Sequence, residues 1–328
     1  MRRKALLLSI GILTMAGMQP GAEVPLAFVH SIGLPHVEGR IDHLAFDAAR
    51  QRLFVAALGN NTVEVLDAKA GVHFKSLAGF REPQGIAVVA DTRTVAVANG
   101  QGEGLALLSA DDLRPAQTIS LGDDSDNVRY DSAARRIYVG YGAGAIAAID
   151  AIGRKRAGEA QLTGHPESFQ LERSGTRIFA NVPTAHQIAV IDRSVMKVMA
   201  TWPVRAAVSN FPMALDEADR RLFIGCRQPA RVLVYDSANG TQVASADIVG
   251  DTDDLFYDAK RKRLYVSGGD GFIDVFQHED ADRLVRIARV PTAAGARTSL
   301  FVPDQDRLYL AVPHRGRQIA EIRVYEPH

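Results

Sequence analysis

Acidic, basic and imidazole side chains recur in this chain just before short apolar stretches, in a mixture able to bind ions or small polar molecules. The residues that we single out are Arg40, Asp42, His43, Gln84, Asp126, Asn127, His165, Glu167, Asn210, Asp251, Asp253, Asp254, Arg297 and His314. An arginine pair such as Arg40 and Arg297 is suited to clamp a carboxylate. His43 or Glu167 is suited to proton transfer. These residue types indicate ligand binding, or hydrolysis, at a shared site.

Several other chemistries are excluded by the sequence. The single cysteine, Cys226, lies in an apolar stretch, which argues against a catalytic thiol and rules out an intrachain disulfide. There is no Gly-x-Ser-x-Gly and no Cys-x-x-Cys-His motif, and the glycine-rich residues 100–104 contain no lysine. We therefore predict no cofactor. The alternative left open is a divalent cation, Ca²⁺ or Mg²⁺, held by donors from Asp42, His43, Asp126, His165, Glu167 and Asp253.

The candidate residues belong to a repeated unit. Its openings align at positions 43, 85, 127, 168, 212, 254 and 299, with successive separations of 42, 42, 41, 44, 42 and 45 residues. A period of about 40–45 residues with four strand-like stretches in each unit is typical of the blades of a β-propeller. The sequence therefore predicts an all-β, seven-bladed propeller of four-stranded antiparallel blades that spans residues 23–328 as a single domain.

The first unit shows how a blade is encoded. Residues 44–46, 52–57, 62–66 and 72–77 alternate in polarity as half-buried strands do, and polar turns separate them. The same pattern returns in residues 263–276, RLYVSGGDGFIDVF. Aspartates follow the first strand (Asp47, Asp131, Asp216, Asp258) and the third strand (Asp67, Asp150, Asp192, Asp236). We expect these aspartates to bond the backbone of their own turns.

The two ends of the repeat predict how the ring closes. The seventh unit supplies residues 299–302, 307–313 and 319–325 and is one strand short, whereas residues 26–32 form a spare strand before the first unit. We expect this N-terminal strand to complete the last blade from outside. That pairing closes the ring and covers strand edges that would otherwise be exposed.

Circular closure gathers the candidate residues. The first strand of each blade in a propeller lines the central channel, so the residues just before it surround one mouth. Loops between second and third strands face the same mouth and add Tyr141, His186, Arg227, Asp270, His314 and Arg315. We predict a polar ligand-binding ring there. The alternative for any one member is a structural role, because polar residues at strand starts often bond loop backbone.

The repeat resembles the YVTN-type repeat of YncE-like bacterial propellers. The resemblance is carried by a pattern that begins Arg-Leu/Ile-Phe/Tyr-Val, continues with Gly or Asn residues and ends in an apolar stretch followed by Asp. Residues 221–236 and 263–276 are examples. The resemblance implies the propeller fold and, most often, a binding role. Two other groups of propellers differ from this chain in blade number. Gluconolactonase-like propellers resemble a ring of six blades and quinoprotein dehydrogenases a ring of eight, whereas this chain has seven units. Phosphogluconolactonase-type propellers are similar in blade number.

Charge and the N-terminal residues constrain location and partners. The chain has 38 Lys and Arg and 38 Asp and Glu, so a nucleic-acid partner is not expected. Residues 1–22 combine a basic start with an apolar run over 5–18, which is typical of a cleaved signal peptide and too short for a span. We expect a periplasmic or secreted monomer with no membrane span after cleavage.

Together, these features predict an exported propeller that binds a small ligand or a periplasmic protein through the polar ring. The alternative is a hydrolase or isomerase that acts on a lactone or sugar acid, assisted by a metal or by a histidine and a carboxylate.

Overall fold

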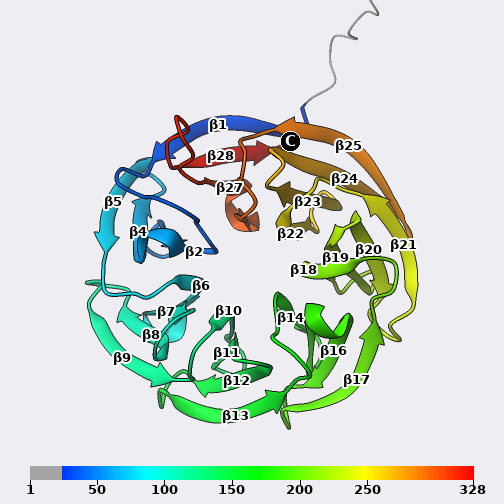
Figure 1. The fold of residues 1–328 in the computed structure, drawn as a ribbon, viewed down its shortest axis with the longest axis horizontal. Helices are drawn as coiled ribbons and strands as arrows, with labels where there is room; N and C mark the ends of the chain where they lie inside the picture. Colours follow the sequence, from blue (N-terminus) through cyan, green and yellow to red (C-terminus); the bar gives the residue numbers. More distant parts are fainter. Residues whose placement is uncertain (1–23) are drawn as a thin grey trace, which may run out of the picture.

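Each repeat unit folds into a four-stranded antiparallel sheet, and seven such sheets stand side by side around one axis (Figure 1). The computed structural model describes residues 24–328. The predicted signal peptide, residues 1–22, lies outside the described residues. Within residues 24–328 no helix has the length and apolar character needed to cross a bilayer. The predicted fold, a seven-bladed β-propeller, is confirmed.

Strands of a blade follow one another outward from the axis. The innermost strands are β2 (Leu44–Asp47), β6 (Pro83–Val89), β10 (Ser125–Asp131), β14 (Phe169–Leu171), β18 (Val208–Asp216), β22 (Thr252–Asp258) and β26 (Ser299–Val302). The second strands are β3 (Arg52–Ala57), β7 (Thr94–Asn99), β11 (Arg136–Tyr141), β15 (Arg177–Val182), β19 (Arg221–Gln228), β23 (Arg263–Gly268) and β27 (Arg307–Val312). The third strands are β4 (Thr62–Asp67), β8 (Gly104–Ser109), β12 (Ala145–Asp150), β16 (Gln187–Asp192), β20 (Ala230–Asp236), β24 (Phe272–Asp280) and β28 (Glu321–Pro327).

The outermost strands form the rim of the ring (Figure 1). They are β5 (Val72–Leu77), β9 (Pro115–Ser120), β13 (Lys155–Gln161), β17 (Lys197–Pro203), β21 (Gln242–Asp247), β25 (Arg283–Pro291) and β1 (Leu26–Gly33). Short 3-10 turns are η1 (Leu58–Asn60), η2 (Ala90–Thr92), η3 (Pro183–Ala185) and η4 (Pro303–Gln305).

The N-terminal strand closes the ring as predicted. The last blade has the order β1-β28-β27-β26, and β1 pairs with β28 antiparallel from Leu26 opposite Pro327 to Gly33 opposite Glu321. Hydrogen bonds between the first and last described strands thus hold the circle together (Figure 1). Every other blade is built from consecutive strands.

The apolar core is divided among the interfaces between blades. The described residues contain seven buried clusters, one at each contact between neighbouring blades. The second and third strands are therefore buried on both faces, and all six residues of β7 are buried. We had expected half-buried strands from the alternating pattern. The expectation was wrong for these strands because each blade is covered by a neighbour on both sides. Exposed faces occur on the outer strands, such as β9.

The turn aspartates have the predicted structural role. Backbone N–H groups of the following turn donate to all eight: Asp47, Asp67, Asp131, Asp150, Asp192, Asp216, Asp236 and Asp258. These carboxylates therefore stabilise hairpin turns. The candidate residues lie at the starts of the innermost strands, so the turns that follow those strands lie on the opposite face of the propeller.

Candidate functional site

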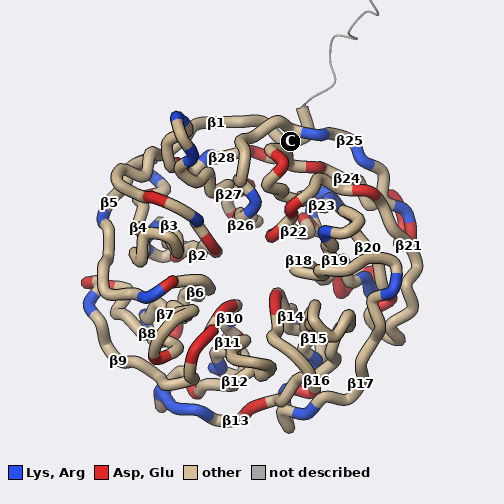
Figure 2. The backbone as a smooth tube through the Cα atoms, viewed as in Figure 1, with Lys and Arg blue, Asp and Glu red and all other residues tan. Residues whose placement is uncertain are grey.

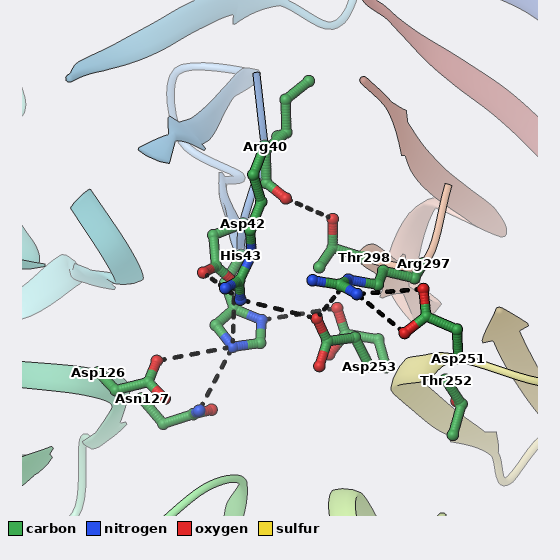
Figure 3. Close-up of polar contacts among 12 residues, drawn as sticks. Arg40, Asp42, His43, Asp126, Asn127, Asp251, Thr252, Asp253, Arg297 and Thr298 are labelled. Carbon is green, nitrogen blue, oxygen red and sulfur yellow. Dashed lines mark hydrogen bonds and ion pairs between the residues drawn. The ribbon is translucent and has the colours of Figure 1, made fainter. Parts of the chain in front are cut away.

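Irregular strand starts point the candidate side chains toward the axis. The pairing register shifts in β10 between Ser125 and Val128 and in β22 between Thr252 and Asp254. A bulge bends the strand and re-aims the extra residue. These shifts span Asp126, Asn127 and Asp253, three of the predicted residues, all labelled in Figure 3. In Figure 2, backbone positions occupied by Asp or Glu lie close to the axis at β10, β14 and β22.

Three arginines from three blades share two aspartates at the mouth. Asp253 lies 2.6 Å from Nη2 of Arg227, 3.0 Å from Nε of Arg297 and 3.8 Å from Nη2 of Arg40. Asp251 lies 2.8 Å from Nη1 of Arg297 and 3.7 Å from Nε of Arg227. Arg40 also donates to Oδ2 of Asp42 at 2.9 Å, so three guanidinium groups face three carboxylates here. Figure 3 shows Arg40 and Arg297 converging on Asp253.

A layer of polar side chains centred on His43 lies beneath the mouth. Nε2 of His43 is 3.3 Å from the amide nitrogen of Asn127, 3.7 Å from Oδ1 of Asp42 and 4.0 Å from Oδ1 of Asp126. Nδ1 faces Oδ2 of Asp254 at 3.5 Å. The imidazole therefore lies among residues of the first, third and sixth blades (Figure 3).

Burial and charge set the protonation of this layer. Burial alone lowers the pKa of His43, but the carboxylates of Asp254 and Asp42 outweigh it and raise the pKa to about 10. Burial also raises the pKa of Asp42 to about 6, although His43 and Arg40 oppose the rise. At neutral pH His43 is thus an imidazolium held by carboxylates.

A second histidine and two carboxylates converge at the edge of the mouth. The ring of His165 places Nδ1 2.7 Å from the carbonyl oxygen of Gly142 and 3.2 Å from Oδ2 of Asp124, and Nε2 3.8 Å from Oδ2 of Asp126. One donor atom each of Asp126, His165 and Glu167 lies within 4.8 Å of the other two. This cluster joins the third and fourth blades.

The protonation of this cluster is also set by its surroundings. Burial, reinforced by the charge of Asp126, raises the pKa of Glu167 to about 8. Burial lowers the pKa of His165, but Asp126, the Gly142 carbonyl and Asp124 raise it to about 9. Burial opposes ionisation of Asp126, yet His165 and other cations hold its pKa below the ordinary value. The cluster therefore contains one ionised and one protonated carboxyl group near neutral pH.

These groups surround a cavity of about 180 Å³, the space of about six water molecules. Its lining residues are Arg40, Gln84, Asp124, Asp126, His165, Glu167, Phe211, Arg227, Asp253 and Arg297. Seven of the residues predicted from the sequence are among them: Arg40, Gln84, Asp126, His165, Glu167, Asp253 and Arg297. The structure thus brings together residues of the first through seventh blades; whether they bind a ligand stays a prediction.

The cavity is also lined by residues outside the predicted ring. Arg227, which we had assigned to a facing loop, belongs to β19 and stacks on Phe211, with its guanidinium carbon 4.1 Å from the ring centroid. Sequence reasoning missed Phe211 because we considered only polar residues there. Asp124 was missed because it lies one residue before β10, although its spacing of two from Asp126 was a usable signal.

The other predicted residues lie outside this cavity. Asp42, His43, Asn127 and Asp254 form the layer beneath the cavity, and Asp254 accepts a hydrogen bond from the backbone of Ser299 at 2.9 Å. The buried amide of Asn210 donates to Asn181 and to the Gln187 carbonyl. Asp251 and His314 line a neighbouring cavity of about 240 Å³, where Nδ1 of His314 is 2.7 Å from Glu38.

A larger cavity of about 450 Å³ lies on the other side of the His43 layer. His43 and Asp254 line it together with later residues of the inner strands, including Phe46 and Tyr130. It shares no lining residue with the polar cavity. Arg129 also lines this cavity, and burial lowers its pKa. We did not anticipate this side of the channel from the sequence.

Comparisons with known proteins support the fold. No family model matches the chain, and no curated protein sequence matches it. A chain in the crystal structure of the mitotic checkpoint complex is similar, with a TM-score of 0.77 and 14% identity over 98% of this chain and 100% of that chain. Hydrazine synthase of Kuenenia stuttgartiensis is similar with a TM-score of 0.74 and 16% identity, over 84% of this chain and 94% of that chain.

At such low identity these likenesses show the seven-bladed propeller fold alone. The function must therefore be argued from the residues of the site.

Proposed function

We propose that this protein binds a small anionic ligand, bearing a carboxylate or a phosphate, in the polar cavity at the mouth. The observation that carries the proposal is the convergence of Arg40, Arg227 and Arg297, from three different blades, on one small cavity that all three line. A bound anion can therefore reach guanidinium donors from all three blades. A planar guanidinium offers paired donors that match a carboxylate or phosphate group.

The remainder of the cavity favours a compact, polar ligand. Its volume of about 180 Å³ is small, and Gln84, His165 and Glu167 supply hydrogen-bonding groups on its walls. The one aromatic wall, Phe211, is covered by Arg227. A ligand with hydroxyl groups and a single acidic group, such as a small sugar acid, has the matching chemistry.

Titration calorimetry with gluconate, succinate and inorganic phosphate tests this proposal. We expect saturable binding of at least one of them to the purified protein at low salt. Arg40→Ala should weaken the binding, because it removes one of the three guanidinium groups that line the cavity. The Arg40 side chain is 44% exposed, and a thermal melt checks that the variant is folded. Arg231→Ala is the matched control, since Arg231 on the third strand of its blade is also exposed but pairs with Asp247 on the outermost strand.

No binding of any of the three anions, or equal binding by Arg40→Ala and wild type, would contradict the proposal. A protein ligand is the other partner class consistent with the predicted binding role. It would be indicated by a partner whose binding is lost in Arg40→Ala while the three small anions fail to bind.

One observation also favours a hydrolase of lactones or sugar acids as a second candidate. Glu167 has a pKa of about 8 beside His165 and Asp126, and a carboxyl group poised near neutral pH is suited to acid–base catalysis. Gluconolactone opening above the uncatalysed rate, abolished in Glu167→Gln, would establish this activity. An uncatalysed rate with wild-type protein would exclude it for this substrate.

We also propose that the protein is exported and is a monomeric relative of the YncE-like propellers. The basic and apolar pattern of residues 1–22 and the RLYV-type repeats support this. N-terminal sequencing of protein recovered from periplasmic and culture fractions tests the export. A mature N-terminus near residue 23 is expected, and an intact Met1 in the cytoplasmic fraction would contradict it.

A further inference from the structure

We infer that Asp126, His165 and Glu167 form a binding site for a first-row divalent transition-metal ion. The three side chains come from two neighbouring blades, with Asp126 on β10 and the other two just before β14. Their donor atoms all lie within 4.8 Å of one another, as three ligands of one ion do. The inference is independent of the proposed anion binding.

Asp126 supplies the second observation. This residue is only 6% exposed, and its Oδ1 has no hydrogen-bond partner within the described chain. Its Oδ2 is 3.8 Å from Nε2 of His165, which is too long for a hydrogen bond. A buried carboxylate that accepts no hydrogen bond is costly, and the nearest imidazole nitrogens, of His165 and His43, are 3.8 and 4.0 Å away. A metal ion coordinated by Asp126 would supply the direct contact that these cations do not make.

The surroundings of His165 orient it as a ligand. Its Nδ1 lies 2.7 Å from the carbonyl oxygen of Gly142, an atom that can only accept, so we assign the proton to Nδ1. Asp124 reinforces this assignment, with Oδ2 3.2 Å from the same nitrogen. A metal ion that displaces the Nε2 proton of the imidazolium would bind the lone pair on the side of Asp126. Metal-binding histidines in proteins are held in the same way by an acceptor behind the ring.

The donor set distinguishes among metals. One imidazole and two carboxylates suit Zn²⁺, Mn²⁺, Co²⁺ or Fe²⁺, whereas Ca²⁺ and Mg²⁺ prefer oxygen donors alone. The histidine therefore favours a transition metal over the Ca²⁺ or Mg²⁺ considered from the sequence. Three protein ligands also leave coordination positions open toward the cavity that these residues line.

A second cluster in the described residues lacks this arrangement. Asp216, Asp219 and His278 are equally close together. However, Nδ1 of His278 is 3.2 Å from the hydroxyl group of Tyr257, and Nε2 is 3.1 Å from the carbonyl oxygen of Ala281. Both ring nitrogens are engaged, so this histidine has no lone pair to offer a metal.

Metal titration of untagged, chelator-treated protein tests the inference. We expect Zn²⁺, Co²⁺ or Mn²⁺ to bind with one-to-one stoichiometry in calorimetry, and bound Co²⁺ to show an absorption spectrum typical of nitrogen and oxygen ligands. Glu167→Ala and His165→Ala should lose more affinity than the roughly 10–100-fold that removal of an outer partner costs. Asp124→Ala, which alters an outer partner at an exposed position, should fall within that smaller range.

His73→Gln is the matched control, because His73 lies on the outermost strand β5, pairs with Glu64 and is outside the cluster. It should bind the metal as wild type does. Thermal melts of each variant establish that it is folded, and Asp126→Asn provides an isosteric test of the buried ligand. No binding by wild type, or unchanged affinity in folded Glu167→Ala and His165→Ala, would overturn the inference. Because these titrations contain no organic anion, their failure would not bear on the proposed ligand.

Discussion

His43 and Asp254 belong to the first and sixth blades, yet their side chains meet near the axis, with 3.5 Å between Nδ1 and Oδ2. The other side of the ring faces Asp42 and Asp126. One partly buried imidazolium therefore links acidic side chains that neighbouring strands alone would not bring together (Figure 3). This contact separates the polar mouth from the larger cavity on the other side.

The charge of His43 predicts a pH dependence of stability in chelator-treated protein. The pKa of His43 is about 10 in the folded protein and 6.5 ordinarily. Its raised pKa contributes stability that is fully present below pH 6.5 and is lost as the pH rises through about 10. We expect the free energy of unfolding, measured by urea denaturation, to fall across this interval more steeply in wild type than in His43→Gln.

Other groups titrate in the same interval, notably Glu167 and His165. The difference between wild type and His43→Gln isolates the contribution of His43. Parallel pH profiles for the two proteins would show that His43 is not held as an imidazolium.

Gly85 should tolerate no side chain. This residue stands in the second blade at the position that His43 and Asn127 occupy in the first and third. A Cβ at Gly85 would lie 2.2 Å from the carbonyl oxygen of Asp126 and 2.8 Å from the backbone nitrogen of Val128. Since backbone atoms cannot move aside cheaply, we expect Gly85→Ala to lower the free energy of unfolding by about 1–3 kcal/mol.

Gly33→Ala is the control for this prediction. Gly33 lies at the end of β1, and a Cβ there meets no atom within 4 Å. The melting temperature of Gly33→Ala should match or slightly exceed that of wild type, because alanine reduces the entropy of the unfolded chain. Equal melting temperatures for both variants would contradict the close approach of the second and third blades.

The closure of the ring makes Leu26 important for stability. Leu26 is fully buried in the cluster between the sixth and seventh blades, with Tyr325 of β28 in the same cluster. Truncation to alanine should cost about 2–5 kcal/mol of unfolding free energy in chemical denaturation. Val29→Ala, on the exposed side of the same strand, should stay within about 0.5 kcal/mol of wild type. A small effect of Leu26→Ala would indicate that the last blade does not need β1.

Cys226 should be inert in the folded protein. Its side chain is buried in β19, and burial raises the pKa of the thiol to about 12. Because the thiolate is the reactive form, a thiol-specific chromogenic reagent at pH 8 should modify Cys226 only after denaturation. Rapid modification of native protein would contradict this burial.

The amino-acid sequence alone was sufficient to predict the blades. Each hairpin joins strands that are adjacent in the chain, so turn residues such as Asp47 and the apolar stretches beside them specify the pairing locally. The spare strand that became β1 was predictable because the last unit was one strand short. The part of the site that lies at the strand starts, including Arg40, Asp126 and Arg297, followed from the same repeat.

Contacts between blades were decided only by the tertiary structure. Register shifts at the starts of inner strands set where side chains such as Asp126 and Asp253 point, and these shifts depend on packing against neighbours. The repeat pattern likewise contains no signal that Arg227 reaches Asp253 or that His43 divides the channel. Hairpin pairing depends on residues close in the chain, whereas ion pairs across the axis depend on the circle that all seven blades form together.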